Sequence, residues 1–175
     1  ESEWWLLRKS GIKDFFTKDL RLFPYCRDCG TPLSSHEVAQ GYKAVKERSA
    51  IVRFKVKGED AYFLAWTTTP WTLPSNVALC VNPDDTYCKV KAVDGYTYYM
   101  AEALLDKVLG TLEREEGTPA YEVLQTYKGS ELEYKEYEPL YACAAESAAR
   151  QNKKGHFVTC DGYVSMSDGT GIVHI

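Results

Sequence analysis

The sequence has no long apolar run and no excess of positive charge. Hydrophobic residues make up 45% of its 175 residues, but no run approaches the about 20 residues that a membrane-spanning helix needs, and no secretory signal is visible. The net charge is −4, with 21 Lys and Arg against 25 Asp and Glu. A stand-alone nucleic-acid-binding domain usually carries a basic face, so strong independent binding to DNA or RNA is not expected. A module that meets only the end of a nucleic acid held elsewhere remains compatible with this balance.

Cysteine occurs six times, yet only Cys26 and Cys29 have a tight spacing. A Cys-x-x-Cys turn can supply two of the four ligands of a tetrahedral zinc site. The chain contains no second Cys-x-x-Cys, so we expect half a site at most; His36 is a candidate third ligand, and a turn with two free thiols is the alternative. The other four Cys stand in apolar or strand-like contexts, where free Cys behaves as a small hydrophobe. This usage favours a reducing, cytoplasmic compartment.

Short apolar runs separated by turn residues predict many short strands. The expected strands cover residues 51–57, 61–66, 76–81, 87–93, 96–100, 121–127, 157–160 and 171–175. Asp94-Gly95 is a hairpin signal between two of these strands. Helices are expected within 4–22, over 101–109 and over 142–150. Ser34 and Glu37 resemble a helix-capping box, but the weak periodicity of the residues that follow leaves helix and strand both open there. The pattern predicts a mainly β fold with helical additions, in the form of a closed or nearly closed β-barrel.

The chain divides by composition into two parts. We expect residues 1–45 to be a connective segment that holds the Cys-x-x-Cys knuckle, and residues 46–175 to form the barrel domain. Within the second part, residues 129–141 are rich in Glu and Tyr and are predicted to lie on the surface. Because the first residue is Glu1 and the last apolar run stops at Ile175 in a strand-like position, we expect a piece of a larger protein.

A threonine-rich stretch, WTTTPWTLPSN, follows the most apolar predicted strand and covers residues 66–76. Three consecutive Thr supply hydroxyls that both donate and accept hydrogen bonds. Pro70 and Pro74 stiffen the backbone and interrupt regular pairing. The stretch can therefore line a small pocket with hydroxyls at its rim. The alternative is a buried strand with a turn, because Thr and Trp also favour strands.

The same stretch resembles the Thr-rich signature of the editing domain inserted into class I synthetases for Ile, Val and Leu. Two further segments are similar to the isoleucyl enzymes: PYCRDCGTPLSSHEVAQGYK at 24–43 and DGTGIVHI at 168–175. Valyl and leucyl enzymes typically have Arg where this chain has Thr69, which favours the isoleucyl type. The chain thus resembles the editing (CP1) domain of isoleucyl-tRNA synthetases, and the expected barrel is of the type shared by the Val, Ile and Leu editing domains.

This resemblance implies hydrolysis of valine wrongly attached to tRNA(Ile), with valyl-adenylate as a further candidate substrate. The implied catalytic residues are Thr67, Thr68, Thr69 and His174. The implied substrate-binding residues are Trp66, Trp71, Thr72, Asn76 and Gly171. The Thr-rich stretch and His174 are expected to face each other across a cavity sized for valine, with His174 acting as a wall. Editing itself would need no cofactor.

Further expectations concern the protein of which the chain would be a part. The parent enzyme would ligate isoleucine to tRNA(Ile) with ATP and Mg²⁺, bound outside this chain, and could hold zinc at Cys26 and Cys29. The partners implied are the 3′ end of tRNA(Ile) carrying valine and the rest of the synthetase chain, with no membrane; the piece itself would be monomeric. In the family, an Ala-Pro segment and an acidic residue follow the strand at His174, and this chain stops before both.

Two alternatives stay open at this point. The chain could be the sister editing domain of a valyl- or leucyl-tRNA synthetase. It could also be a non-catalytic β-barrel binding module with a zinc knuckle, which would account for the strands, the knuckle and the acidic balance. That reading gives no reason for the Thr-rich stretch or for its order relative to DGTGIVHI.

Overall fold

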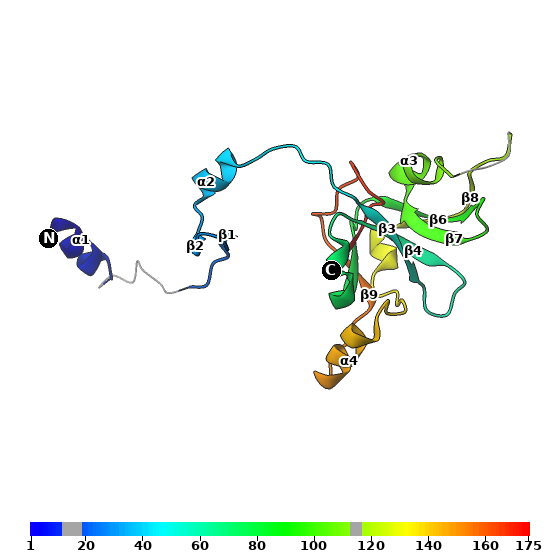
Figure 1. Ribbon diagram of the computed structural model, residues 1–175. Helices are drawn as coiled ribbons and strands as arrows, with labels where there is room; N and C mark the ends of the chain where they lie inside the picture. The colour runs from blue at the N-terminus through cyan, green and yellow to red at the C-terminus, as the bar shows by residue number, and fades with distance from the viewer. Residues whose placement is uncertain (12–18, 113–116) are drawn as a thin grey trace. The chain divides into compact units, whose positions relative to one another are not determined.

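A computed structural model describes residues 1–11, 19–112 and 117–175 of the chain. By internal contacts these residues fall into two compact units, Glu1–Lys46 and Glu47–Ile175 (Figure 1). Each unit is described separately below. The part of the expected N-terminal helical region that holds Ile12, Phe15 and Phe16 lies outside the described residues.

The described residues of the first unit form two short helices and a small hairpin. Its elements are α1 (Ser2–Gly11), β1 (Tyr25–Cys26), β2 (Thr31–Pro32) and α2 (Ser35–Gln40). β1 and β2 pair antiparallel, and Gly30 takes the positive φ of +69° that the tight turn between them requires. The predicted capping box is confirmed: the backbone N–H of Glu37 donates to the Ser34 hydroxyl, and the Glu37 carboxylate accepts from the Ser34 backbone N–H.

The second unit is built on a five-stranded sheet with the order β3-β4-β7-β6-β8. Its strands are β3 (Ala50–Lys55), β4 (Tyr62–Thr67), β6 (Thr86–Ala92), β7 (Thr97–Ala101) and β8 (Tyr121–Lys128). The predicted hairpin is confirmed, because β6 and β7 pair antiparallel around Asp94 and Gly95, with Gly95 at φ +88°. β4 and β7 instead run parallel, which makes the sheet mixed. β8 forms one edge and is largely exposed.

A three-stranded sheet with the order β10-β5-β9 completes the second unit. It consists of β5 (Ala78–Val81), β9 (Phe157–Cys160) and β10 (Ile172–His174). The two sheets are linked by residues 134–138, since Tyr137 bridges to Val56 beyond β3 and Glu136 bridges to Phe157 in β9. The fold is therefore mixed α/β and strand-rich. Closure of the strands into one barrel stays a prediction.

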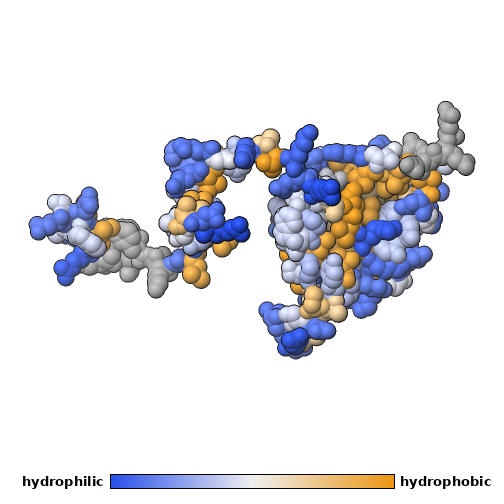
Figure 2. Space-filling view, in the orientation of Figure 1, coloured by the Kyte–Doolittle hydropathy of each residue, from blue (hydrophilic) through white to orange (hydrophobic). Residues whose placement is uncertain are grey.

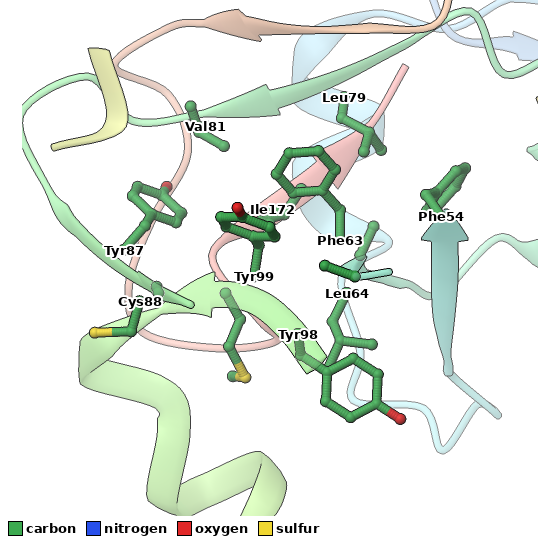
Figure 3. Close-up of a cluster of buried hydrophobic side chains, with 14 of the residues drawn as sticks. Phe54, Phe63, Leu64, Leu79, Val81, Tyr87, Cys88, Tyr98, Tyr99 and Ile172 are labelled. Carbon is green, nitrogen blue, oxygen red and sulfur yellow. The ribbon is translucent and has the colours of Figure 1, made fainter. Parts of the chain in front are cut away.

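The hydrophobic core lies in the second unit and draws on both sheets. Phe54, Phe63 and Tyr99 of the larger sheet are fully buried, as are Leu79 and Ile172 of the smaller one. Figure 3 shows these side chains pointing toward one another between the two sheets. On the outside, Figure 2 shows apolar patches among hydrophilic ones on this unit. Burial of the apolar faces against each other is the main stabilising contribution to this arrangement.

Two sequence predictions needed correction. The helix expected over 101–109 is split, because β7 runs to Ala101 and is followed by a 3-10 turn η2 (Glu102–Leu104) before α3 (Leu105–Leu109). The segment 129–141 is not merely a surface segment: it contains the 3-10 turn η3 (Gly129–Leu132), and its Leu132 and Tyr137 are buried in the core. Sequence could not reveal this, since the apolar residues there follow neither a strand nor a helix period.

The helix expected over 142–150 is confirmed as α4 (Ala142–Arg150). It contacts η1, a 3-10 helix over Pro70–Ser75 that occupies the Thr-rich stretch. Within the described part of the chain, none of the helices combines the length and the apolar character needed to span a bilayer.

Candidate active site

The Thr-rich stretch changes direction where β4 ends at Thr67. Pro70 occupies the first turn of η1, where a missing backbone N–H costs no helical hydrogen bond. The turn is tightened by its own threonines: the backbone N–H and the hydroxyl of Thr72 both donate to the carbonyl oxygen of Thr69, at 3.0 and 2.7 Å. The backbone N–H of Thr69 donates to the Thr67 hydroxyl at 3.0 Å. The sequence thus folds its own hydroxyls into one small cluster.

His174 reaches this cluster from the end of β10, more than 100 positions away in the sequence. Its Nε2 lies 3.2 Å from the hydroxyl oxygen of Thr67 and 3.2 Å from that of Thr72. β10 is held beside β5 by antiparallel pairing, with His174 opposite Leu79. Because η1 leads directly into β5, the pairing brings the imidazole back over the Thr-rich stretch.

The hydrogen bond of Thr72 to the Thr69 carbonyl favours a His174 ring that carries its proton on Nε2. The single hydroxyl proton of Thr72 is used on the Thr69 carbonyl, so Thr72 accepts from the imidazole rather than donating to it. The other ring nitrogen, Nδ1, is buried and has no hydrogen-bond partner among the described residues. A protonated ring would bury an unpaired N–H there. Burial also lowers the pKa of His174 below its ordinary value, which keeps the imidazole neutral near pH 7.

The expected cavity between the Thr-rich stretch and His174 is replaced by direct contact. The hydrogen bonds at 3.2 Å leave no space between the imidazole and Thr67. The open side of the cluster is the surface formed by Thr68, Thr69 and Trp71, all exposed, with the Trp71 side chain 71% accessible. A substrate would therefore lie on top of the Thr–His cluster and against Trp71, rather than between the two halves.

Trp66 and Gly171 belong to a neighbouring pocket instead. Successive residues of a strand point to opposite faces, so Trp66 turns away from the side of β4 that carries Thr67. It lines a pocket of about 290 Å³ together with Gly171 and residues of the 163–173 segment, among them Ser165 and Asp168. The structure thus divides the sequence-predicted site residues between a hydroxyl–imidazole cluster and an adjacent pocket.

Similar proteins place this geometry in a family. No family model matches the chain. A curated isoleucine–tRNA ligase of Clostridium acetobutylicum is 50% identical over 176 residues, which cover 100% of this chain and 16% of the relative. The corresponding enzyme of Clostridium kluyveri is 47% identical over 99% of this chain and 15% of its own length, and that of Thermus thermophilus is 46% identical over 99% and 16%.

Solved structures agree on the fold. The editing domain of the P.knowlesi cytosolic leucyl-tRNA synthetase aligns with a TM-score of 0.54, covering 77% of this chain and 60% of that one at 16% identity. A second leucyl-tRNA synthetase CP1 domain, GlLeuRS-CP1, aligns at 0.52 over 73% of this chain and 52% of that one, also at 16% identity. The chain belongs to the editing (CP1) domains of isoleucyl-tRNA synthetases. It spans about a sixth of the curated relatives that it matches.

Asn76 of this CP1 domain lies just outside the hydroxyl–imidazole cluster. Its side chain is 3% exposed. The amide nitrogen donates to the carbonyl oxygens of Ala78 and Ile175, and the amide oxygen accepts from the Tyr137 hydroxyl. All these partners lie within the protein, so Asn76 holds backbone rather than presenting its amide to a substrate. Tyr137 was missed by sequence reasoning, because nothing in its local pattern sets it apart from the other tyrosines of 129–141.

The Cys-x-x-Cys knuckle of the CP1 domain offers two ligands only. The backbone N–H of Cys29 donates to the Cys26 sulfur at 3.4 Å, and hydrogen bonds from Cys29 lower the pKa of the Cys26 thiol. His36 is hydrogen-bonded to Gln40. Within residues 1–11, 19–112 and 117–175, no group of three or more His, Cys, Asp or Glu side chains is placed to hold a metal ion. The described residues therefore do not complete a tetrahedral zinc site.

Proposed function

We propose that this CP1 domain hydrolyses the ester that links valine to tRNA(Ile), and that valyl-adenylate is a second substrate. The observation that carries the proposal is the cluster of Thr67, Thr72 and His174, which joins two segments more than 100 residues apart through hydrogen bonds of 3.2 Å. A purely structural turn would not need a half-buried imidazole whose Nδ1 is buried without a partner at the edge of exposed hydroxyls.

The need for such a site follows from the small difference between the two amino acids. Isoleucine exceeds valine by one methylene, which an apolar pocket can discriminate by only about 1–3 kcal/mol, and isoleucyl-tRNA synthetases are themselves the standard illustration of this limit. A second site that admits valine and excludes isoleucine by size raises the overall selectivity. The rigid imidazole of His174, hydrogen-bonded on one side and packed on the other, suits the role of the excluding wall.

Hydrolysis of this ester depends more on the orientation of substrate and water than on a strong acid or base. Water attacks the carbonyl carbon of the ester, a tetrahedral intermediate forms, and the bond to the ribose oxygen of the terminal adenosine breaks as that oxygen takes a proton. An aminoacyl ester is already activated, so fixing substrate and water in place supplies much of the rate. The exposed hydroxyls of Thr68 and Thr69 can hold the ribose hydroxyls and the water.

His174 acts in this proposal as a neutral hydrogen-bond donor, not as the base. Its Nε2 proton is directed at Thr67 and Thr72, and its free lone pair on Nδ1 is buried away from the exposed threonines. A general base must reach the water it deprotonates. The imidazole instead fixes the orientation of the two hydroxyls, so that their remaining lone pairs face the substrate side.

The same proposal extends to the whole enzyme. The parent synthetase would ligate isoleucine to tRNA(Ile) with ATP and Mg²⁺ outside this chain, and would present the mischarged 3′ end to this domain. Any zinc site would take Cys26 and Cys29 as two ligands and draw the others from elsewhere. All six cysteines are free thiols, which supports a reducing, cytoplasmic location.

The test is deacylation of valyl-tRNA(Ile) by the complete synthetase that contains this chain. Thr68→Ala removes an exposed hydroxyl, and His174→Ala removes the wall. We expect Thr68→Ala to slow deacylation by roughly tenfold or more, and His174→Ala to allow hydrolysis of correctly charged isoleucyl-tRNA(Ile). Thr126→Ala is the matched control for Thr68→Ala, since Thr126 is also an exposed threonine and lies on β8, an edge strand of the larger sheet. Unchanged hydrolysis in both site variants would contradict the proposal.

A second experiment distinguishes an isoleucyl from a valyl editing domain. Threonyl-tRNA(Val) and valyl-tRNA(Ile) are offered to the same preparation. Preference for the valyl ester supports the isoleucyl assignment of the substrate, and preference for the threonyl ester would overturn it.

A further inference from the structure

We propose that Tyr137 is a positioning residue of the hydrolytic site and that it acts through Asn76. The inference rests on the proposed function and deepens it. Tyr137 belongs neither to the Thr-rich stretch nor to the strand that carries His174. It comes from the segment that links the two sheets, where its backbone bridges to Val56.

Packing and a backbone hydrogen bond fix the position of the Tyr137 side chain. The side chain is 2% exposed. Its ring packs edge-on against Phe54, with ring centres 5.3 Å apart, and against His156 at 5.7 Å. Its backbone N–H donates to the His156 carbonyl at 3.0 Å. The hydroxyl therefore has one well-defined position, and burial raises the pKa of the phenol so that it stays a donor.

That hydroxyl donates to the amide oxygen of Asn76 at 2.7 Å. With its oxygen so engaged, the Asn76 amide turns its nitrogen toward two carbonyl oxygens, those of Ala78 at 2.8 Å and Ile175 at 3.0 Å. Both N–H bonds of the amide are thus used. The amide orientation is consistent with this pattern only, because a flipped amide would direct its oxygen at two acceptors.

Asn76 thereby joins the two halves of the candidate site. Its own backbone N–H donates to the carbonyl oxygen of Leu73 and closes the C-terminal end of η1. Its side chain holds the carbonyl of Ile175, the residue directly after His174. The Ile175 carbonyl also accepts from the backbone N–H groups of Val77 and Ala78 at 2.7 and 3.2 Å, so the Asn76 amide is the side-chain part of this connection between the Thr-rich stretch and the strand end. The Tyr137 hydroxyl sets how that amide is turned.

Removing the hydroxyl leaves the buried amide oxygen of Asn76 without its donor. The amide can then rotate to find another partner, and the Ile175 carbonyl keeps only its two backbone donors, the N–H groups of Val77 and Ala78. A shift of the strand end would carry His174 with it and disturb its contacts with Thr67 and Thr72. Small displacements of this kind change rates strongly even when the altered residue is remote from the chemistry.

The experiment measures two rates in the complete synthetase containing this chain: deacylation of valyl-tRNA(Ile) and of isoleucyl-tRNA(Ile). Their ratio separates positioning from general destabilisation. A variant that is only less folded loses both rates in proportion, whereas a displaced wall changes the ratio. The variants are Tyr137→Phe, Asn76→Ala and the double variant, because residues that act in series are not additive.

Tyr99→Phe is the matched control. Tyr99 is equally buried, at 1% exposed, and its hydroxyl also donates a hydrogen bond, but to Glu59 in the turn between β3 and β4. Its ring neighbours are Phe63 and Tyr127, which lie outside the Thr-rich stretch. Loss of one buried hydrogen bond is thus common to both variants, and the connection to the site is the difference.

We expect Tyr137→Phe to lower the valyl-to-isoleucyl ratio about tenfold, the factor typical of one lost buried hydrogen bond. Asn76→Ala should lower it at least as much, and the double variant no further than Asn76→Ala alone. Tyr99→Phe should leave the ratio unchanged. Tyr137→Phe with the ratio of wild type, or with effects that add to those of Asn76→Ala, would overturn the inference.

Thr68→Ala and His174→Ala are included to tell the two possible failures apart. If both impair editing while Tyr137→Phe does not, the proposed function stands and only the role of Tyr137 is refuted. If neither alters deacylation, the proposed function itself fails and the positioning role falls with it.

Discussion

Replacement of Gly171 by Ala is expected to destabilise the second unit strongly. Gly171 comes directly before β10 and has a φ of +72°. A Cβ built on it would lie 2.4 Å from the Cβ of Ala101 and 3.1 Å from the sulfur of Met166. The carbonyl oxygen of Gly171 also accepts from the buried hydroxyl of Tyr87 at 2.7 Å, so the backbone cannot move away without losing that hydrogen bond.

The magnitude combines two costs. A left-handed backbone costs an L-residue about 1–2 kcal/mol relative to glycine. Carbon atoms normally approach to about 3.5–4.0 Å, so a contact of 2.4 Å with Ala101 demands a shift of roughly 1 Å, and such overpacking costs about 1–3 kcal/mol. The free energy of unfolding should therefore fall by about 2–5 kcal/mol.

Gly58→Ala is the control that separates these costs. Gly58 has nearly the same φ, +79°, but a Cβ there would meet nothing within 4 Å. Gly58→Ala should lower the free energy of unfolding only by the backbone cost of about 1–2 kcal/mol. Equilibrium urea denaturation of both variants, compared at equal m-values, measures the difference. Equal losses for Gly171→Ala and Gly58→Ala would refute the argument from close packing against Ala101.

Three further outcomes follow from charges and caps. Burial lowers the pKa of His174, so as the pH falls the unfolded chain takes up the imidazole proton before the folded chain does. The free energy of unfolding should therefore decrease as the pH drops below the ordinary pKa of 6.5. In a pH series of urea midpoints, His174→Gln should remove this decrease. Burial would raise the pKa of Glu59, but hydrogen bonds from Lys135 and Lys89 outweigh it and lower the pKa to about 2. The contribution of ionised Glu59 to stability is therefore present above the ordinary pKa of 4.5 and is lost as the pH falls toward 2. Glu59→Gln should lower the free energy of unfolding by about 1–2 kcal/mol at pH 7 and by little at pH 2, measured by the same urea titration. Ser34→Ala should destabilise α2 by about 1 kcal/mol, seen as faster amide exchange in that helix, and unchanged exchange would contradict the capping box.

Local features of the second unit could be predicted because their causes are local. The apolar run ending at Trp66 predicted β4, and Asp94-Gly95 predicted the turn between β6 and β7. The split of the expected helix over 101–109 could not be predicted, because Ala101 is held in β7 by pairing with Tyr87 in β6. That competition between a helical pattern and a strand partner is decided only when the sheet forms.

At the candidate site, too, the residues could be predicted from the sequence but their contacts could not. Sequence resemblance alone singled out the threonines and His174, and the structure brings Thr67, Thr72 and His174 into contact. The predicted cavity between them was wrong, since no sequence pattern tells whether two side chains touch or leave a gap. Asn76 was expected at the substrate, yet its amide is used within the protein.

The amino-acid sequence by itself determined the strands, the capping box, the turns and the family, because propensity, periodicity and motif act over a few residues at a time. Only the tertiary structure decided which hydroxyls meet the imidazole and that Tyr137 reaches Asn76. These depend on contacts between residues 61 to 107 positions apart, and such contacts exist only once the two sheets have packed around one core.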